Sequence, residues 1–147
     1  MKPEYKNIFI HGAISAQKIA ESISQHSRKT TIGGHGIFLG QVRADEKPSG
    51  KVNAIEYSAY EEMALEKAHE IREDAFAKYP LICMHIYHSL GKVEAGEICL
   101  FVFVSSKHRK AAIDACTEIV ERIKKELPVW GKEIISESES SWKENNI

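Results

Sequence analysis

Three basic residues stand together at the start of a predicted helix, where cations are normally unfavourable. Lys107, His108 and Arg109 follow Ser106, which we expect to be the N-cap. Each cation there opposes the helix dipole, at a cost of about 0.3–1 kcal/mol at an exposed site. Because unpaired backbone N–H groups and cationic side chains converge at this end, the segment predicts a site for an anion. The alternative is a solvated basic helix start that tolerates the cost.

Two more cations, Lys124 and Lys125, occupy the last turn of the same helix, predicted over about residues 107–127. Cations are favoured at a helix C-terminus, so complementing the dipole is one explanation for both. Lys124 also follows Ile123 at the edge of the apolar stripe, so its aliphatic stem can pack while its ammonium faces a partly dry cleft. That position suits acid–base chemistry.

Arg43 ends a predicted strand and precedes the polar residues 44–51, which contain Pro and Gly and are predicted to form a mobile loop. Sites are common where a strand ends in a flexible loop, although an ordinary surface arginine also fits the pattern. Trp130 and Lys132 follow the end of the long helix. Trp130 either anchors the core or lines a pocket.

The three cysteines, Cys83, Cys99 and Cys116, lie in apolar periodic segments without a Cys-x-x-Cys spacing, which predicts buried, reduced thiols. His85 and His88 are three apart on a predicted strand and therefore point to opposite faces. A metal shared by these two histidines is not expected, and we predict no metal site. The glycines at 33–36 lack the spacing of a phosphate loop or a dinucleotide fingerprint.

Periodicity places the chemistry-bearing residues on an α+β framework, predicted to be one domain over residues 1–147 with a polar tail at about 136–147. Glycine-rich residues 33–36 and 91–96 are predicted to be a chain break and a turn. Strands are predicted at 8–10, 37–42, 52–60, 82–88, 98–104 and 129–135, and helices at 15–23, 61–79 and 107–127. Because strands and helices neither alternate strictly nor segregate, a mixed or antiparallel sheet with packed helices is expected.

Charge and hydropathy exclude several classes of function. The net charge is −1, with 20 basic and 21 acidic residues, so bulk charge gives no support to nucleic-acid or membrane binding. No apolar stretch approaches the roughly 20 residues that span a bilayer, and the apolar residues 8–10 are too few for a signal-peptide core. We expect a cytoplasmic protein.

Over residues 8–143 the chain resembles the large, catalytic subunit of molybdopterin synthases, because a series of motifs stands in that family's order. The motifs are Gly40-Gln41-Val42-Arg43, Glu56-Tyr57, Glu62-Met63-Ala64, His88-Ser89-Leu90-Gly91, Gly96-Glu97, Ser106-Lys107-His108-Arg109, Lys124 and Pro128-Val129-Trp130-Gly131-Lys132-Glu133. The combination is specific, whereas no single motif is. The resemblance implies an α/β-hammerhead-like α+β fold.

The resemblance also implies an activity. Sulfur would pass from the C-terminal thiocarboxylate of a small ubiquitin-like partner to a cyclic pyranopterin monophosphate, forming the molybdopterin dithiolene without a cofactor or a cysteine of this chain. Lys124 and Lys132 are the implied catalytic residues. The implied substrate-binding residues are Gln41, Val42, Arg43, His108, Arg109, Lys124, Gly131, Lys132 and Glu133.

Two positions depart from the family pattern. The family usually has Arg where this chain has Ser89, and a catalytic Lys directly after the Trp, where this chain has Gly131 followed by Lys132. Either Lys132 takes over that role with a local backbone shift, or activity depends more on Lys124. The alternatives are a non-catalytic homologue that binds the partner or a pterin, and a small-ligand regulatory or oligomerisation module.

Helix geometry predicts the assembly. His108 and Lys124 are 16 residues apart on one helix, or about 24 Å at 1.5 Å per residue. Because a pterin monophosphate is shorter than that, both helix ends can serve one substrate only if they come from different copies of the chain. We therefore expect a homodimer with active sites shared across its interface.

Overall fold

A computed structural model describes residues 4–135 of the chain, which form a seven-stranded sheet and three helices. In chain order these are β1 (Phe9–His11), α1 (Ala16–His26), β2 (Gly34–Gln41), β3 (Glu46–Lys47), β4 (Gly50–Ala59), α2 (Glu61–Lys78), β5 (Leu81–Glu94), β6 (Ile98–Ser106), α3 (Arg109–Glu126) and β7 (Val129–Ile135). The sheet order is β2-β6-β5-β4-β3, with β1 on β5 and β7 on β4. Since β1 pairs in parallel and the other described pairs are antiparallel, the predicted α+β fold with a mixed sheet is confirmed.

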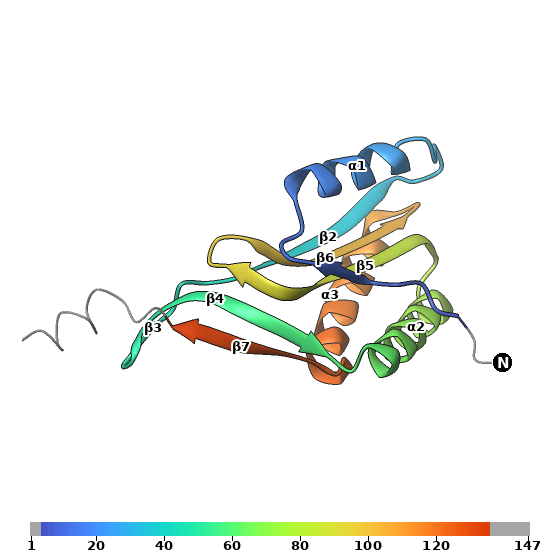
Figure 1. Cartoon of the computed structure of the whole chain (residues 1–147). Coiled ribbons are helices and arrows are strands. Elements are labelled where there is room, and N and C mark those ends of the chain that lie inside the picture. The colour runs from blue at the N-terminus through green and yellow to red at the C-terminus, as the bar shows by residue number, and fades with distance from the viewer. Residues whose placement is uncertain (1–3, 136–147) are drawn as a thin grey trace, which may run out of the picture.

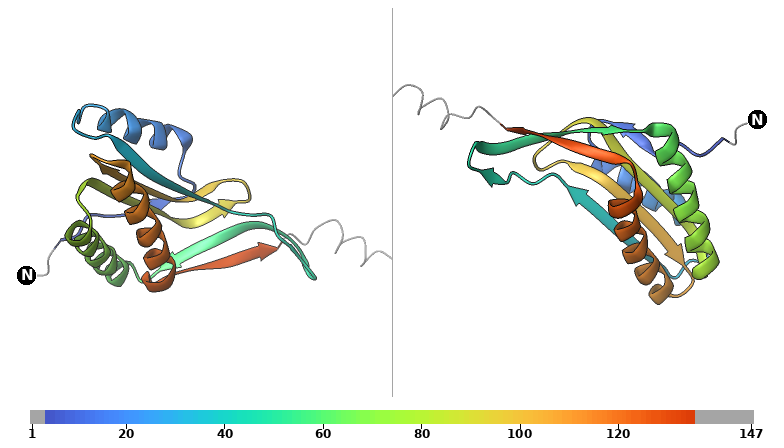
Figure 2. Two further views of the ribbon diagram at one scale, coloured as in Figure 1. Left: turned by 180° about the vertical axis from the view of Figure 1, so that it is seen from behind. Right: turned by 90° about the horizontal axis from the view of Figure 1, so that it is seen from below.

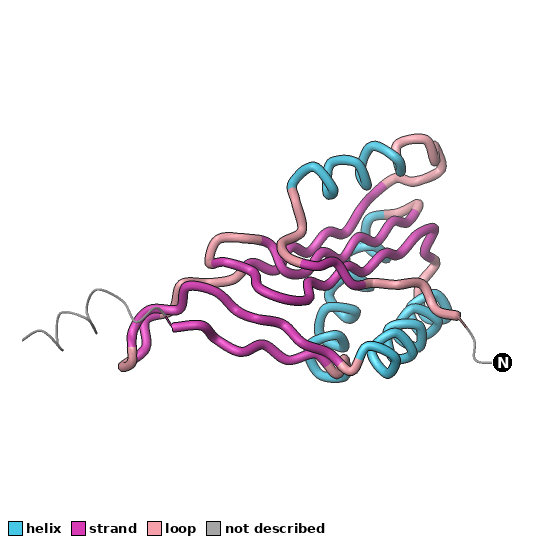
Figure 3. The backbone as a smooth tube through the Cα atoms, in the orientation of Figure 1, coloured by secondary structure: helices cyan, strands magenta, loops and turns pink. Residues whose placement is uncertain are grey.

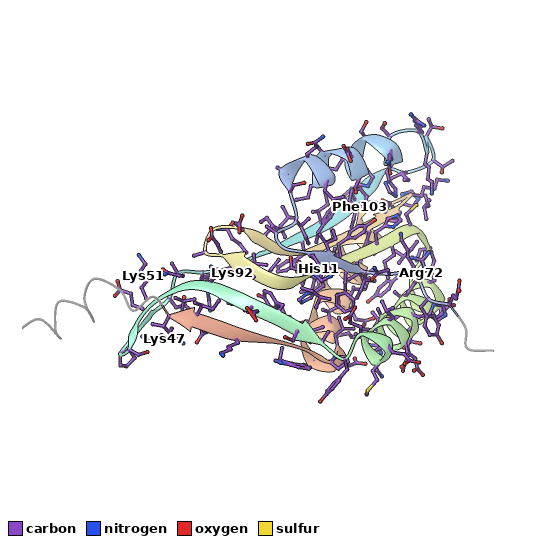
Figure 4. The ribbon with its side chains drawn as sticks, viewed as in Figure 1. His11, Lys47, Lys51, Arg72, Lys92 and Phe103 are labelled. Atoms are coloured by element: carbon purple, nitrogen blue, oxygen red, sulfur yellow. The ribbon has the colours of Figure 1, made fainter. Side chains whose placement is uncertain are left out.

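Helix α1 covers one face of the sheet, and α2 and α3 lie side by side on the other (Figures 1 and 2). Strand β6 is buried between these layers, as its unbroken apolar run predicts. Its Phe101 and Phe103 pack toward α1, and Phe103 is labelled there in Figure 4. Leu100 and Val102 belong to the larger core beneath α2 and α3. The two faces of the sheet therefore have separate cores.

Strand β2 begins earlier than predicted, because the glycines at 33–36 do not break the chain. A side chain on Gly36 would place its Cβ 2.5 Å from the backbone oxygen of Ala112, and one on Gly33 would meet the backbone oxygen of Lys107. Glycine is required there because the start of α3 packs directly onto β2. The predicted chain break is therefore wrong, and the glycines bring the basic helix start against the sheet.

Strand β5 continues through the segment predicted to be a turn. It pairs with β6 over Leu81–His88, with β1 over His88–Leu90 and with β4 over Gly91–Glu94, and the turn to β6 follows only after Glu94. Gly91 has a φ of 80°, a conformation that glycine adopts readily and that marks the point where β5 changes neighbours. The predicted turn at 91–96 was too long.

The N-cap of α1 is the predicted residue, whereas the N-cap of α3 is a different one. The Ser15 side chain accepts a hydrogen bond from the Lys18 backbone N–H at 3.1 Å, so the predicted N-cap of α1 is confirmed. The N-cap of α3 is His108 and not Ser106, which lies buried at the end of β6 with its hydroxyl donating to the His108 backbone oxygen. Lys107 and His108 therefore precede α3, and Arg109 is its first residue.

The segment predicted as a loop at 44–51 contains a β-hairpin instead. Glu46 pairs with Lys51 and Lys47 with Gly50, and the tube in Figure 3 shows β3 and β4 turning at the far end of the arm that β3, β4 and β7 form. The chain can turn between β3 and β4 because Gly50, at a φ of 135°, adopts a backbone conformation that other residues rarely reach. The polar tail predicted at 136–147 lies outside the described residues.

Candidate functional site

The start of α3 presents a cationic hollow at the edge of the sheet. His108 has extended backbone geometry and no side-chain cap, which leaves the first N–H groups of α3 open to a ligand. The hollow is lined by Gly33, Lys107, His108, Arg109, Lys110, Ile113 and Asp114. Lys110 bonds Asp114 at 2.8 Å, whereas no described residue forms an ion pair with His108 or Arg109. This arrangement can hold an anion such as a phosphate.

The other end of α3 places Lys124 beside a group of partly buried side chains from the sheet. The charge of Lys124 lies close enough to His88 to contribute to lowering its pKa. His88 is 6% exposed, and its ring meets that of Tyr57 edge-on, with centroids 5.2 Å apart. Cys99, on β6 beyond β5, lies close enough to Tyr57 to contribute to raising its pKa. We call Lys124, His88, Tyr57 and Cys99 the lysine cluster.

The environment of the lysine cluster sets the protonation of His88 and Tyr57. Burial lowers the pKa of His88 most, and the nearby Lys124 lowers it further, although a hydrogen bond to the Ser89 backbone oxygen at 2.8 Å acts in the opposite direction. Burial, followed by the Cys99 contact, raises the pKa of Tyr57 above its ordinary value. At neutral pH His88 is therefore uncharged and Tyr57 protonated. No described residue forms an ion pair with Lys124, so its ammonium can meet an anionic reacting group.

Strand register separates Lys132 from this cluster. On the β4–β7 ladder Gly131 pairs with Tyr57 and Lys132 with Glu56, and paired residues share a face of the sheet. Lys132 therefore projects from the face opposite Tyr57. A side chain on Gly131 would project toward Tyr57, but its Cβ would lie 2.5 Å from Cγ2 of Ile55. Ile55 thus fills the space that a residue at 131 would use.

The remaining predicted substrate-binding residues lie around the arm and the end of β2. Val42 is 2% exposed and bonds through its backbone to Gly96 and Glu97, so it supports the site rather than presenting a side chain. Arg43 is open to solvent, with an Asp45 oxygen 3.4 Å away. Gln41 is exposed at a register irregularity of β2. Glu133 pairs with Lys47 at 3.6 Å, a half-exposed ion pair that stabilises little.

One chain does not bring the two cationic ends together. Arg109 begins α3 and Lys124 lies in its last turn, a separation of about 22 Å at 1.5 Å per residue. Figure 2 shows α3 as one continuous helix that leads from the end of β6 to the start of β7. The cationic hollow and the lysine cluster are therefore separate half-sites in a single chain.

The three cysteines are enclosed in the fold, whereas Trp130 is partly open to solvent. Cys83, Cys99 and Cys116 are all buried and unpaired, as predicted, and burial raises the pKa of Cys116 to about 11. Trp130 is 48% exposed, with its ring 5.0 Å from that of Tyr60. It is not a core anchor.

His88 and Tyr57 stand in motifs of the sequence, but the spacing of those motifs does not place the two side chains beside each other. They lie on β5 and β4 and meet only because β5 changes partner near Gly91 and the register sets Tyr57 opposite it. Ser89, which stands where the family usually has an arginine, is fully buried, and its hydroxyl has no hydrogen-bond partner among the described residues. An arginine at that position would need a different local packing.

The fold is that of an α+β protein with cationic side chains at both ends of α3, an arrangement that can accept an anionic ligand. A family model described as MoaE protein matches residues 11–126. The molybdopterin synthase catalytic subunit of Pyrococcus abyssi is 43% identical over 121 residues, or 82% of this chain and 80% of that protein. The chain therefore belongs to the MoaE protein family.

Solved structures agree with this assignment. The crystal structure of molybdopterin synthase from Staphylococcus aureus has a TM-score of 0.76 and 29% identity, and the match covers 92% of this chain and 96% of that one. A complex of subunits 1 and 2 of the molybdopterin-converting factor from Helicobacter pylori has a TM-score of 0.75 over 88% and 85% of the two chains, and at 20% identity it shows a shared fold. No helix in residues 4–135 has the length and apolar character to cross a membrane.

Lys132→Ala should reduce turnover less than about fivefold, because Lys132 projects from the face opposite the lysine cluster. The measurement is the steady-state rate of product formation by purified variant and unaltered protein under the same conditions. Glu56→Gln, on the paired residue of the same face, is the matched control. A loss as large as that caused by removing Lys124 would mean that Lys132 reaches around the edge strand to the reacting groups.

Proposed function

We propose that this chain is the catalytic subunit of a molybdopterin synthase. It transfers sulfur from the C-terminal thiocarboxylate of a small ubiquitin-like subunit to cyclic pyranopterin monophosphate, and the product carries the dithiolene of molybdopterin. The 43% identity to a named catalytic subunit over most of both chains supports the activity. The Helicobacter complex of two subunits supports the small partner. A cytoplasmic location remains part of the proposal.

The proposal rests on the cationic side chains at the two ends of α3, Arg109 and Lys124, which form no ion pair with a described residue. The cationic hollow suits the phosphate, since the His108 and Arg109 side chains and the first N–H groups of α3 converge there. Arg43 and Gln41 lie at the other end of β2 from the hollow, about 30 Å along the strand, and both are exposed. We therefore assign them to a pterin or phosphate held by the hollow of a second copy of the chain.

Lys124 is assigned the principal catalytic role. Its ammonium has no carboxylate partner among the described residues, so it can neutralise the anionic thiocarboxylate and the charge that develops on the departing oxygen. Uncharged His88 and protonated Tyr57 do not compete with the substrate for that charge. We assign Gly131 and Glu133 to the surroundings of the lysine cluster, since they pair with Tyr57 and Ile55 on the same face of the β4–β7 ladder. Lys132 is given a binding role at most.

A homodimer unites the two half-sites. Three apolar side chains are exposed near the edge of the sheet: Ile37 and Leu39 on β2, and Ile113 on α3, the helix whose start forms the cationic hollow. They are 42%, 42% and 52% exposed in the single chain. A second copy that covers this surface would carry its own Arg109 toward the neighbouring Lys124. Each active site would then take one end of α3 from each chain.

The second candidate is a homologue that binds the small partner or a pterin without turnover. Gly131 favours it, because Ile55 occupies the space where family members place a lysine. Both candidates require partner binding, whereas only the first requires Lys124. The two are therefore separated by catalysis and not by complex formation.

The deciding experiment mixes the purified chain with a thiocarboxylated small subunit and cyclic pyranopterin monophosphate, then quantifies molybdopterin as its fluorescent oxidation product. Product should accumulate with multiple turnovers when thiocarboxylate is in excess. A small subunit ending in an ordinary carboxylate is the control, and it should give no product. Complex formation without product in the complete mixture would establish the non-catalytic homologue.

A further inference from the structure

A second group of chemistry-bearing side chains lies on the opposite face of the sheet from the lysine cluster. Cys83 and His85 are two residues apart on β5, so both project toward α1, whereas His88 projects toward α2 and α3. His26, the last residue of α1, completes the group. One potential ligand atom from each of the three side chains lies within 4.8 Å of the other two.

The His26 ring is oriented as a metal ligand requires. Its Nδ1 lies 2.7 Å from the Ser22 backbone oxygen, which can only accept, so Nδ1 carries the proton and Nε2 presents a lone pair. That Nε2 lies 2.9 Å from Nε2 of His85. Metal-bound histidines commonly donate their second ring N–H to a carbonyl in this way, which fixes the tautomer and direction of the ring.

Burial limits how far these groups can move. His26 is 8% exposed and Cys83 is 5% exposed. The ring of Phe103, which Figure 4 labels between the sheet and α1, lies 4.7 Å from the His26 ring centroid. A tetrahedral zinc ion needs nitrogen ligands about 3.3 Å apart and sulfur about 3.6 Å from nitrogen, given its usual bond lengths. Side-chain adjustments of about 1 Å meet that geometry.

Two lysines contact the group. Lys6 Nζ lies 3.1 Å from Nδ1 of His85, and Lys29 Nζ lies 2.9 Å from the Cys83 sulfur. Both lysines are exposed, so each ammonium can turn into water. His85 would then carry its proton on Nδ1 and bind through Nε2, and Cys83 would release its proton to solvent. The ammonium groups oppose a dication, so they lower the affinity of the site.

We propose that His26, Cys83 and His85 bind a zinc ion through two imidazole nitrogens and one thiolate, with water completing the tetrahedron. One sulfur and two nitrogens are a donor set that zinc favours over magnesium or calcium, which take oxygen ligands. The site joins the end of α1 to β5, so the ion fixes that helix on the sheet. Sequence reasoning weighed His85 only against His88, because nothing in the spacing brings His26 to β5.

The test titrates Co²⁺, a spectroscopic stand-in for zinc, into the full chain after treatment with a chelator. One equivalent should produce a near-ultraviolet thiolate-to-cobalt charge-transfer band together with visible bands of tetrahedral cobalt, and zinc should displace it. Cys83→Ser should remove the charge-transfer band, and His85→Gln should weaken binding at least about 100-fold. Lys29→Ala should bind several-fold more tightly, because it removes an opposing charge.

Cys116→Ser is the matched control, since Cys116 is equally buried but lies on α3 beneath the other face. It should bind cobalt like the unaltered chain. Circular dichroism and thermal unfolding of each metal-free variant establish that the chain is folded before titration. Absence of the charge-transfer band in the unaltered chain, or its persistence in Cys83→Ser, would overturn the proposal.

Discussion

Lys124→Ala should lower the rate of molybdopterin formation at least about 100-fold while leaving the chain folded and able to bind the small subunit. The side chain is exposed at the end of α3, so its removal opens no cavity in the core. What is lost is an ammonium that no described carboxylate neutralises, beside an uncharged His88. The measurement is the rate of product formation in the reconstituted synthase.

Lys125→Ala is the matched control for this prediction. Lys125 belongs to the same helical turn and carries the same charge, but its charge acts on Glu126 and not on His88. Both variants remove one cation from the helix C-terminus, so any effect on the helix dipole is common to them. Equal losses in the two variants would attribute the effect to helix stability and would leave Lys124 without a specific role.

The sequence predicted those parts of the fold that depend on local pattern. The apolar run of β6, the buried stripe of α3 and the Ser15 cap each follow from residues close in the chain, and each is present in the structure. The glycines at 33–36 were misread because their requirement comes from α3, about 75 residues later, whose backbone approaches the sheet there. Local composition cannot distinguish such a strand from a turn.

The candidate site also combines features that depend on neighbouring residues with features that depend on distant ones. The cationic residues at the start of α3 are visible in the sequence because they oppose the helix dipole, and Lys124 is visible because it lies at the edge of the apolar stripe in the last turn. The neighbours of Lys124 are not visible in the sequence. The charge of Lys124 acts on His88, and Tyr57 packs on His88 only because of the strand register and the change of neighbours of β5 at Gly91. The register of β7 on β4 also shows that Lys132 projects away from Tyr57, which the spacing of residues in the sequence could not show.

Two inactive variants should restore activity to each other when they form a mixed dimer. Arg109→Ala removes a phosphate contact and Lys124→Ala removes the catalytic ammonium. If each site takes Lys124 from one chain and Arg109 from the other, the mixed dimer has one site with both residues and one with neither. Purified mixed dimers should therefore show about half the activity of the unaltered dimer, and a random equal mixture about one quarter.

The mixed-dimer result discriminates between shared and self-contained sites because the two arrangements predict opposite outcomes. When each site is built within one chain, every site of the mixed dimer lacks one of the two residues, and mixing yields no more activity than the average of the parents. Two differently tagged Arg109→Ala chains give the control for subunit exchange and should remain inactive. The length of α3 favours restoration, since about 22 Å separates Arg109 from Lys124 in one chain and a pterin monophosphate cannot span it.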